Sequence, residues 1–184
     1  MARSQPRPPT RMTETSVAEA ALFYLSRFAS SSGNLRRVLM RKVIRSAEHY
    51  GDDPELMKPV VDALVARYAE TGAINDTLYA DTQVRKLRRR GGSARVILQK
   101  LNAKGVPGEI IAETGATLTE GDDRTAAMLF ARRRRLGPFR TENRVENRQR
   151  DLAALGRAGF GYQVAAAIID AEDADALAEM LAGN

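Results

Sequence analysis

The sequence contains no cysteine and no tryptophan, a single histidine, and only 5% aromatic residues. Without cysteine there is no disulfide and no thiolate metal site, which suits a reducing compartment such as the cytoplasm. No apolar run approaches the roughly 20 residues that a membrane-spanning helix needs. The N-terminal residues also lack the apolar segment of a secretory signal. We therefore expect a cytoplasmic protein with no membrane partner.

Aliphatic and basic residues are what the chain has in abundance. Of its 184 residues, 43% are hydrophobic and 28% are charged, a balance typical of a folded protein. Plentiful Ala, Leu and Arg with few aromatics favour packed helices over β-sandwiches. The formal net charge of +6 favours an acidic partner, such as nucleic acid, an acidic protein surface or anionic lipid.

Helix start and stop signals recur along the whole chain. Ser16 followed by Glu19 predicts a capping box, and Asp53 before Pro54 predicts an N-cap with proline at the first helical position. Glycines are placed where helices are expected to end, at Gly72, Gly105 and Gly159. These signals predict an all-α protein of about nine helices, at residues 16–30, 34–44, 54–71, 75–90, 93–104, 107–117, 122–135, 144–158 and 161–181.

The helices contain a repeated apolar pattern. Leu39, Leu101 and Leu155 occupy equivalent places in similar segments, 54 to 62 residues apart. This spacing predicts three tandem three-helix repeats, packed into one elongated body because each alone is too small to be stable. The alternative is coincidence, since any amphipathic helix carries such leucines. The predicted parts are a flexible, basic, proline-rich tail at 1–15 and repeats at 16–73, 74–119 and 120–184.

The middle of the chain is strongly basic. No acidic residue lies between Asp81 and Glu109. At about 100° per residue, Ala80, Val84 and Leu87 form an inward stripe. The opposite side of that helix carries Arg85, Lys86, Arg89 and Arg90, with Arg88 beside the stripe. This part of the chain is therefore predicted to present a cationic surface.

A second basic cluster, Arg132–Arg135, ends a later helix. A smaller group on the second predicted helix consists of Arg36, Arg37, Arg41, Lys42 and Arg45. The alternative interpretation is that cations at helix C-termini are favoured by the helix dipole and keep a face hydrated. The residues predicted to bind a protein or DNA partner are Arg85, Lys86, Arg88, Arg89, Arg90, Arg95, Lys100, Lys104, Arg132, Arg133, Arg134 and Arg135.

We find no catalytic constellation in the sequence. His49 is the only histidine and has no serine or cysteine partner that would define a triad. Asp53 is better explained as a helix cap than as a metal ligand, and Gly91-Gly92-Ser93 lacks the rest of a phosphate loop. We expect no enzyme activity, no metal and no cofactor.

Several short segments, in their order and spacing, resemble a known family. They are Ala20-Ala21-Leu22-Phe23-Tyr24-Leu25, Leu35-Arg36-Arg37-Val38-Leu39-Met40-Arg41-Lys42, Tyr79-Ala80, Val84-Arg85, Gly91-Gly92-Ser93-Ala94-Arg95-Val96-Ile97, Leu101 and Lys104-Gly105-Val106. Through them the chain resembles the RecX family of bacterial recombinase regulators over most of its length after the tail.

The resemblance implies an array of three-helix repeats and a partner, the RecA recombinase assembled on single-stranded DNA. It implies restraint of filament growth, ATP hydrolysis, strand exchange and co-protease activity in DNA repair and the SOS response. It also implies direct binding to single-stranded and double-stranded DNA, and we expect a monomer.

Two residues depart from the family pattern, and one other function stays open. Val43 stands where a glycine commonly ends its helix, so that helix needs a different end. Lys100 stands where relatives often carry an acid, which makes this surface more basic. The alternative function is a general basic helical DNA-binding protein that acts without RecA. Steep salt dependence with little sequence preference would favour that alternative.

Overall fold

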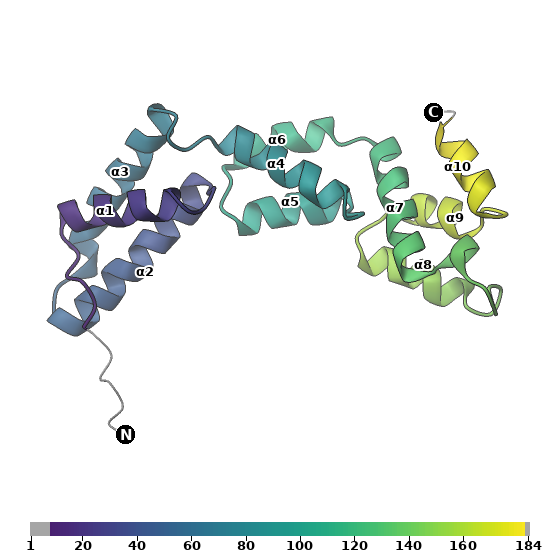
Figure 1. Ribbon diagram of the computed structural model, residues 1–184, viewed down its shortest axis with the longest axis horizontal. Coiled ribbons are helices and arrows are strands. Elements are labelled where there is room, and N and C mark those ends of the chain that lie inside the picture. Colours follow the sequence, from purple (N-terminus) through teal and green to yellow (C-terminus); the bar gives the residue numbers. More distant parts are fainter. Residues whose placement is uncertain (1–7, 183–184) are drawn as a thin grey trace, which may run out of the picture. The chain divides into compact units, whose positions relative to one another are not determined.

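The computed structural model describes residues 8–182, and this part of the chain is all-helical, with no strand. The prediction of an all-α fold is confirmed (Figure 1). The helices are α1 (Glu14–Leu25), α2 (Ser32–Tyr50), the 3-10 turn η1 (Pro54–Met57), α3 (Lys58–Glu70), α4 (Asp76–Arg88), α5 (Ala94–Ala103), α6 (Gly108–Thr117), α7 (Glu120–Arg134), the 3-10 turn η2 (Gly137–Phe139), α8 (Arg148–Arg157), α9 (Tyr162–Ile169) and α10 (Ala174–Ala182).

The chain divides into two compact units. Within the described residues, unit one comprises 8–79 with Lys104–Pro107, and unit two comprises Ala80–Ala103 with 108–182. In unit one, helices α1, α2 and α3 pack on one another. Their shared core is aliphatic and consists of Val17, Ala21, Leu35, Leu39, Val43, Val61, Leu64, Val65 and Ile74.

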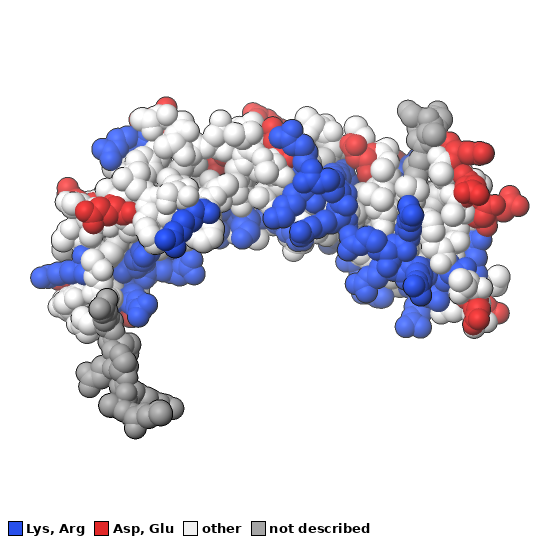
Figure 2. Space-filling view, in the orientation of Figure 1, with Lys and Arg blue, Asp and Glu red and all other residues white. Residues whose placement is uncertain are grey.

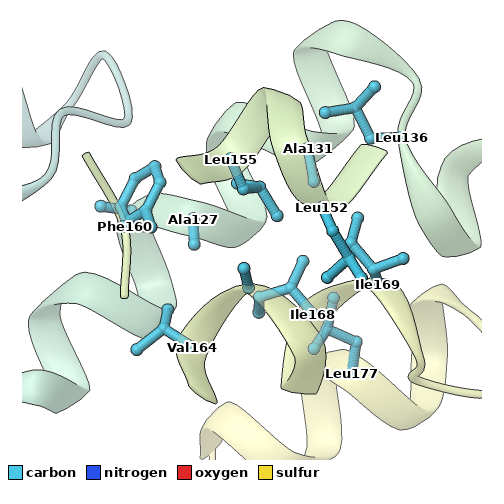
Figure 3. Packing of buried hydrophobic residues seen from close by; sticks show 12 residues of the cluster. Ala127, Ala131, Leu136, Leu152, Leu155, Phe160, Val164, Ile168, Ile169 and Leu177 are labelled. Carbon is cyan, nitrogen blue, oxygen red and sulfur yellow. The ribbon is translucent and has the colours of Figure 1, made fainter. Parts of the chain in front are cut away.

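Unit two is centred on α9, which packs against α7 and α8. Close packing is possible because α7 presents small side chains, Ala127 and Ala131, to the core. Figure 3 shows Leu155 of α8, Ile168 of α9 and Leu177 of α10 directed into the same interior. Burial of these aliphatic side chains, at about 1.5–3 kcal/mol for each one, is the main stabilising contribution.

The predicted repeat register agrees with the pattern of burial. Its three anchors are fully buried: Leu39, Leu101 and Leu155. One turn earlier, α2 and α5 bury Leu35 and Ile97, whereas the equivalent residue of α8 is Asp151, only 1% exposed. Helix α8, the second helix of the third predicted repeat, therefore keeps the register. It places a carboxylate where α2 and α5 place an aliphatic side chain.

A serine at the start of α2 and another at the start of α5 make equivalent contacts. The hydroxyl of Ser31 donates to the carbonyl of Lys104, and the hydroxyl of Ser93 donates to that of Ala158 at 2.8 Å. Each hydroxyl also accepts an N–H from the first turn of its own helix. Both side chains are fully buried, so each serine satisfies a helix cap and an end-of-helix carbonyl together.

An aspartate completes each of these contacts. The N–H of Ser32 donates to Oδ1 of Asp76 at 2.9 Å, and the N–H of Ala94 donates to Oδ1 of Asp123 at 2.8 Å. We name these two sets the first joint (Ser31, Ser32, Asp76 and Lys104, in unit one) and the second joint (Ser93, Ala94, Asp123 and Ala158, in unit two). Each joint fastens the start of one middle helix to two later segments of the chain.

The structure corrects the expected start of the first helix. The capping box predicted at Ser16 and Glu19 is wrong, because α1 begins at Glu14 and Thr13 is its N-cap, paired reciprocally with Ser16. The predicted tail, 1–15, lies partly outside the described residues. Of the rest, Arg11 forms an ion pair with Asp52, which holds this segment close to the C-terminal end of α2.

Two later helix ends also differ in detail from expectation. α2 does not stop at Val43, which is buried, but continues to Tyr50 and ends at Gly51, so the departure at Val43 does give a different helix end. The predicted final helix, 161–181, is two helices, because Asp173 accepts the backbone N–H groups that start α10. Among the described residues, no helix is both long and apolar enough to cross a bilayer.

Candidate interface for an acidic partner

The last turns of α4 and the short segment that follows it expose a row of cations. Arg85, Lys86, Arg89 and Arg90 are all exposed, and none of them forms an ion pair with any described residue. Their orientation follows from the opposite side of the helix, where Ala80 is fully buried. Val84 and Leu87, the other two residues of the predicted inward stripe, are half-buried, and Arg85 and Lys86 lie on the exposed side of α4.

Helix α5 adds two further cations. Arg95 and Lys100 are exposed, while Ile97 and Leu101 on the opposite face are fully buried. Lys104 lies beyond the end of α5 and belongs to unit one, where its carbonyl takes part in the first joint. We therefore do not group Lys104 with the cations of unit two.

Arg88 differs from its neighbours because its side chain bonds to other parts of the fold. Its Nη1 forms an ion pair with Asp123 and donates to the carbonyl of Gly92 at 3.1 Å, and its side chain is only 16% exposed. Asp123 lies 35 residues later in the sequence, so the acid-free stretch around Arg88 is compensated from another helix. Arg88 extends the second joint and holds α4 against the start of α5.

The four consecutive arginines at the end of α7 have four different environments. Arg132 is exposed, and Nη1 of Arg133 donates to the carbonyl of Arg90 at 2.5 Å. The guanidinium of Arg134 lies 5.7 Å from the ring centre of Phe130. Arg135 ends the helix in the left-handed region with a φ of 55°. Arg133 therefore adjoins the segment that follows α4, and Arg132 precedes Arg133 in the sequence.

The ends of α4 and α7 approach closely at Gly91. A Cβ atom at this position would lie 2.9 Å from the carbonyl oxygen of Ala126 and 2.9 Å from the amide nitrogen of Phe130. Only glycine allows so short a distance. Gly91 therefore lets the end of α4 pack against α7, which brings the basic residues of the two helices close together. We name the combined surface the cationic face: Arg85, Lys86, Arg89, Arg90, Arg95, Lys100, Arg132 and Arg133. Figure 2 shows basic side chains gathered over α4 and α5 and over α7 and α8.

Other arginines that look similar in sequence are used to stabilise the fold. Nε and Nη2 of Arg140 donate to the two oxygens of Asp151 at 2.7 and 2.8 Å. Arg148 forms an equivalent pair with Asp170. Nη1 of Arg144 donates to the carbonyl of Glu172. These partners were not predicted from the sequence, because each one lies at least 11 residues from its arginine.

These ion pairs favour the charged forms of the two acids. Burial by itself would raise the pKa of Asp151, but hydrogen bonds from Arg140 and from the N–H of Gly137 outweigh it, and the pKa lies below its ordinary value. The hydrogen bonds from Arg148 likewise lower the pKa of Asp170. Both acids are therefore ionised near neutral pH, and each is hydrogen-bonded to its arginine.

The chemistry of the cationic face is that of anion recognition. A guanidinium presents a planar fork of donors that fits a carboxylate or a phosphate with two parallel hydrogen bonds. No group of three or more metal-binding side chains occurs among residues 8–182. His49 is exposed and its ring meets Tyr50 edge-on at 4.7 Å between centroids.

Comparison with known proteins connects this architecture to one family. A family model described as the second three-helix domain of RecX matches residues 75–114. The regulatory protein RecX of Myxococcus xanthus is 45% identical over 92% of both chains. That of Agrobacterium fabrum is 33% identical over 88% of this chain and 85% of its own. The crystal structure of RecX from Lactobacillus salivarius has a similar fold, with a TM-score of 0.62 at 18% identity, covering 93% of this chain and 97% of that one.

Proposed function

This chain belongs to the RecX family of regulatory proteins, and from that premise we propose that it regulates the RecA recombinase, mainly as an inhibitor. It binds the filament that RecA forms on single-stranded DNA. There it restrains filament growth, ATP hydrolysis, strand exchange and co-protease activity. The cationic face is the surface that meets the filament.

The observation that carries this proposal is the set of cations without an ion-pair partner at the end of α4 and just after it. Arg85, Lys86, Arg89 and Arg90 are exposed, and they have no carboxylate partner within the described chain. Like charges held on one surface repel one another, which costs stability unless a partner offsets it. The neighbouring Arg88 already has a carboxylate partner, Asp123. The four exposed cations do not, so their hydrogen-bond donors can bind an acidic surface.

A regulator of this kind acts by binding one state of the filament more tightly than another. Its effect is limited by the difference in its affinity for those states. A tenfold preference corresponds to about 1.4 kcal/mol at 25 °C. Four or more exposed cations can supply that difference if the filament presents its carboxylates or phosphates differently in its growing and its arrested states.

The test is the single-strand-dependent ATP hydrolysis of RecA, measured while this protein is titrated in. Binding of the protein to the same DNA is measured in parallel at the same salt concentration. We expect inhibition at protein concentrations well below those that coat the DNA. Inhibition that appears only when the DNA is saturated, or no inhibition at all, would contradict action on the filament.

The second candidate is a basic DNA-binding protein that acts without RecA. It is favoured by the same exposed arginines, because a surface of arginine fits phosphates better than it reads base edges. For that function, DNA affinity would fall steeply with salt and vary little with sequence. The ATP hydrolysis experiment separates the two, since only the first candidate inhibits before the DNA is covered.

A further inference from the structure

The loop that leads into α8, residues 140–147, presents an apolar side chain between two acids. Val145 is 83% exposed. Glu142 and Glu146 are exposed as well, and neither forms an ion pair within the described chain. Figure 2 shows acidic side chains at this loop and over α10. We name Glu142, Val145 and Glu146 the loop tip.

Three arginines hold this loop in place. Arg140 at its start and Arg148 just after it each pair with an aspartate of unit two. Between them, the guanidinium of Arg144 donates to three backbone carbonyls, those of Ile169, Ala171 and Glu172. Because the loop is fixed before any contact forms, little conformational entropy is lost when the loop tip binds a partner.

An open groove of about 490 Å³ lies on the surface of α2 in unit one, and we name it the α2 groove. Its apolar part consists of Met40, which is half-buried, and Ile44, which is 42% exposed. The complete lining is Asn34, Arg36, Arg37, Met40, Arg41 and Ile44. Three of these six residues are arginines and none is acidic, so the groove combines an apolar surface with basic edges.

The arginines of the α2 groove differ in what they already bind. Nε and Nη2 of Arg36 donate to the two oxygens of Asp62, at 2.6 and 3.2 Å. Arg41 is exposed, and so is Arg45, one helical turn further along α2. Among the described residues, neither of these two forms an ion pair. Arg41 and Arg45 can therefore bind carboxylates beside an apolar contact.

We propose that the loop tip of one copy of this chain docks into the α2 groove of a second copy. Val145 covers the apolar part of the groove, and the two acids of the loop tip meet Arg41 and Arg45. Specific protein interfaces place apolar surface on apolar surface and acid opposite base, and this chain carries both halves of such a contact. The inference goes beyond the proposed function, because it needs neither recombinase nor DNA.

The size of the two surfaces indicates how strong the contact is. A short loop against the face of one helix buries a small area, and small interfaces are weak and transient. Dilute protein is therefore expected to be monomeric, and association is expected to appear as the concentration rises. Added salt should weaken it, because salt screens pairs of exposed charges.

The test is sedimentation equilibrium of the protein alone. Concentrations up to about 0.5 mM reveal the micromolar dissociation constants that a small interface gives. We expect the mean mass of the parent to rise with concentration, and to rise less at high salt. A mean mass equal to that of the monomer at every concentration, as for a loop that docks within its own chain, would overturn the proposal.

Charge reversal identifies the two surfaces. The loop variant is Glu142→Arg with Glu146→Arg, and the groove variant is Arg41→Glu with Arg45→Glu. Each variant alone carries like charges on both surfaces and is expected to remain monomeric. An equimolar mixture of the two is expected to associate, because each surface of one variant then complements the other surface of its partner. A mixture that stays monomeric, or either variant associating as the parent does, would overturn the proposal.

Two further variants separate this contact from general attraction between charges. Val145→Ser leaves every charge in place and is expected to weaken association about tenfold. Asp175→Arg with Glu179→Arg makes the same change in net charge on exposed positions of α10 and is expected to associate as the parent does. Association of Val145→Ser equal to that of the parent, or a loss in the α10 variant equal to that in the loop variant, would overturn a specific contact.

The changed side chains are exposed, so each variant is expected to melt like the parent in circular dichroism. The proposed function is tested separately, since inhibition of RecA by the dilute parent does not depend on these outcomes.

Discussion

Helices α2 and α8 are equivalent in the repeat register, yet they differ at one buried position. In unit one, α2 buries Leu35 within an aliphatic core, and in unit two, α8 buries Asp151 with Arg140 as its partner. The two joints differ in the same sense. Each uses a serine and an aspartate, but the second adds an ion pair between Arg88 and Asp123.

The difference separates two uses of arginine in unit two. Arginines that meet a carboxylate, such as Arg88 and Arg140, orient helices and a loop. Those without one, such as Arg85 and Arg150, are exposed at the surface. Unit one achieves the same helix packing mostly without internal charge. The buried ion pair of unit two is therefore not required by the repeat itself.

The largest expected effect follows from removing the buried carboxylate. Asp151→Ala should lower the free energy of unfolding by about 3 kcal/mol, because it leaves Arg140 and the N–H of Gly137 without a partner and opens a cavity. The measurement is urea unfolding followed by circular dichroism. The equivalent change in unit one, Leu35→Ala, provides the comparison for a purely apolar loss.

A double variant sharpens this prediction. Asp151→Leu with Arg140→Met removes both charges and makes α8 resemble α2 at this position. Replacing a buried ion pair by apolar side chains of similar size is often neutral or stabilising. We expect the double variant to recover most of the stability lost in Asp151→Ala. If the double variant is as unstable as Asp151→Ala, then Asp151 contributes to stability by more than its pairing with Arg140, and this prediction is wrong.

Arg88 and Arg85 form the next pair, since they lie on the same helix but differ in environment. Arg88→Ala should cost about 2 kcal/mol, because it breaks charged hydrogen bonds to Asp123 and Gly92 in the second joint. Arg85→Ala should change stability by no more than about 0.5 kcal/mol, because the side chain is exposed. Equal losses of stability in thermal melts would contradict the separation of the two roles.

The two joint serines test whether the joints are equivalent. Ser31→Ala and Ser93→Ala each remove a helix cap and the bond to a carbonyl, and each should cost about 1.5 kcal/mol. Similar losses in chemical unfolding would support one repeated device. A negligible effect at either serine would show that its joint does not stabilise its unit.

The smallest expected effect is a change in stability at acidic pH. Because the pKa of folded Asp151 lies below its ordinary value, its contribution to stability is complete above about pH 4 and is lost as the pH falls through the folded value. The stability difference between the parent and Asp151→Asn should therefore be constant near neutral pH and shrink below about pH 4. A constant difference down to pH 2 would contradict this assignment.

Local sequence signals predicted much of this structure. Helix periodicity and caps predicted the all-α fold, the buried leucines of the register and the buried position of Ala80 on α4, because these depend on residues within a few turns of one another. The partners of Arg88 and Arg140 could not be predicted in this way, since Asp123 and Asp151 are brought to them by packing between helices. The 62-residue spacing that relates Leu39 to Leu101 also relates Ser31 to Ser93, and this signal could have predicted the paired joints.

The most direct test of the account replaces the unpaired cations of α4. Arg85, Lys86, Arg89 and Arg90 are changed together to serine, and inhibition of RecA's single-strand-dependent ATP hydrolysis is measured. A control removes four exposed cations of unit one, Arg27, Arg41, Lys42 and Arg45. We predict that the α4 variant melts like the parent but loses inhibition, while the control retains it. Inhibition by the α4 variant equal to that of the parent would contradict the assignment of the cationic face.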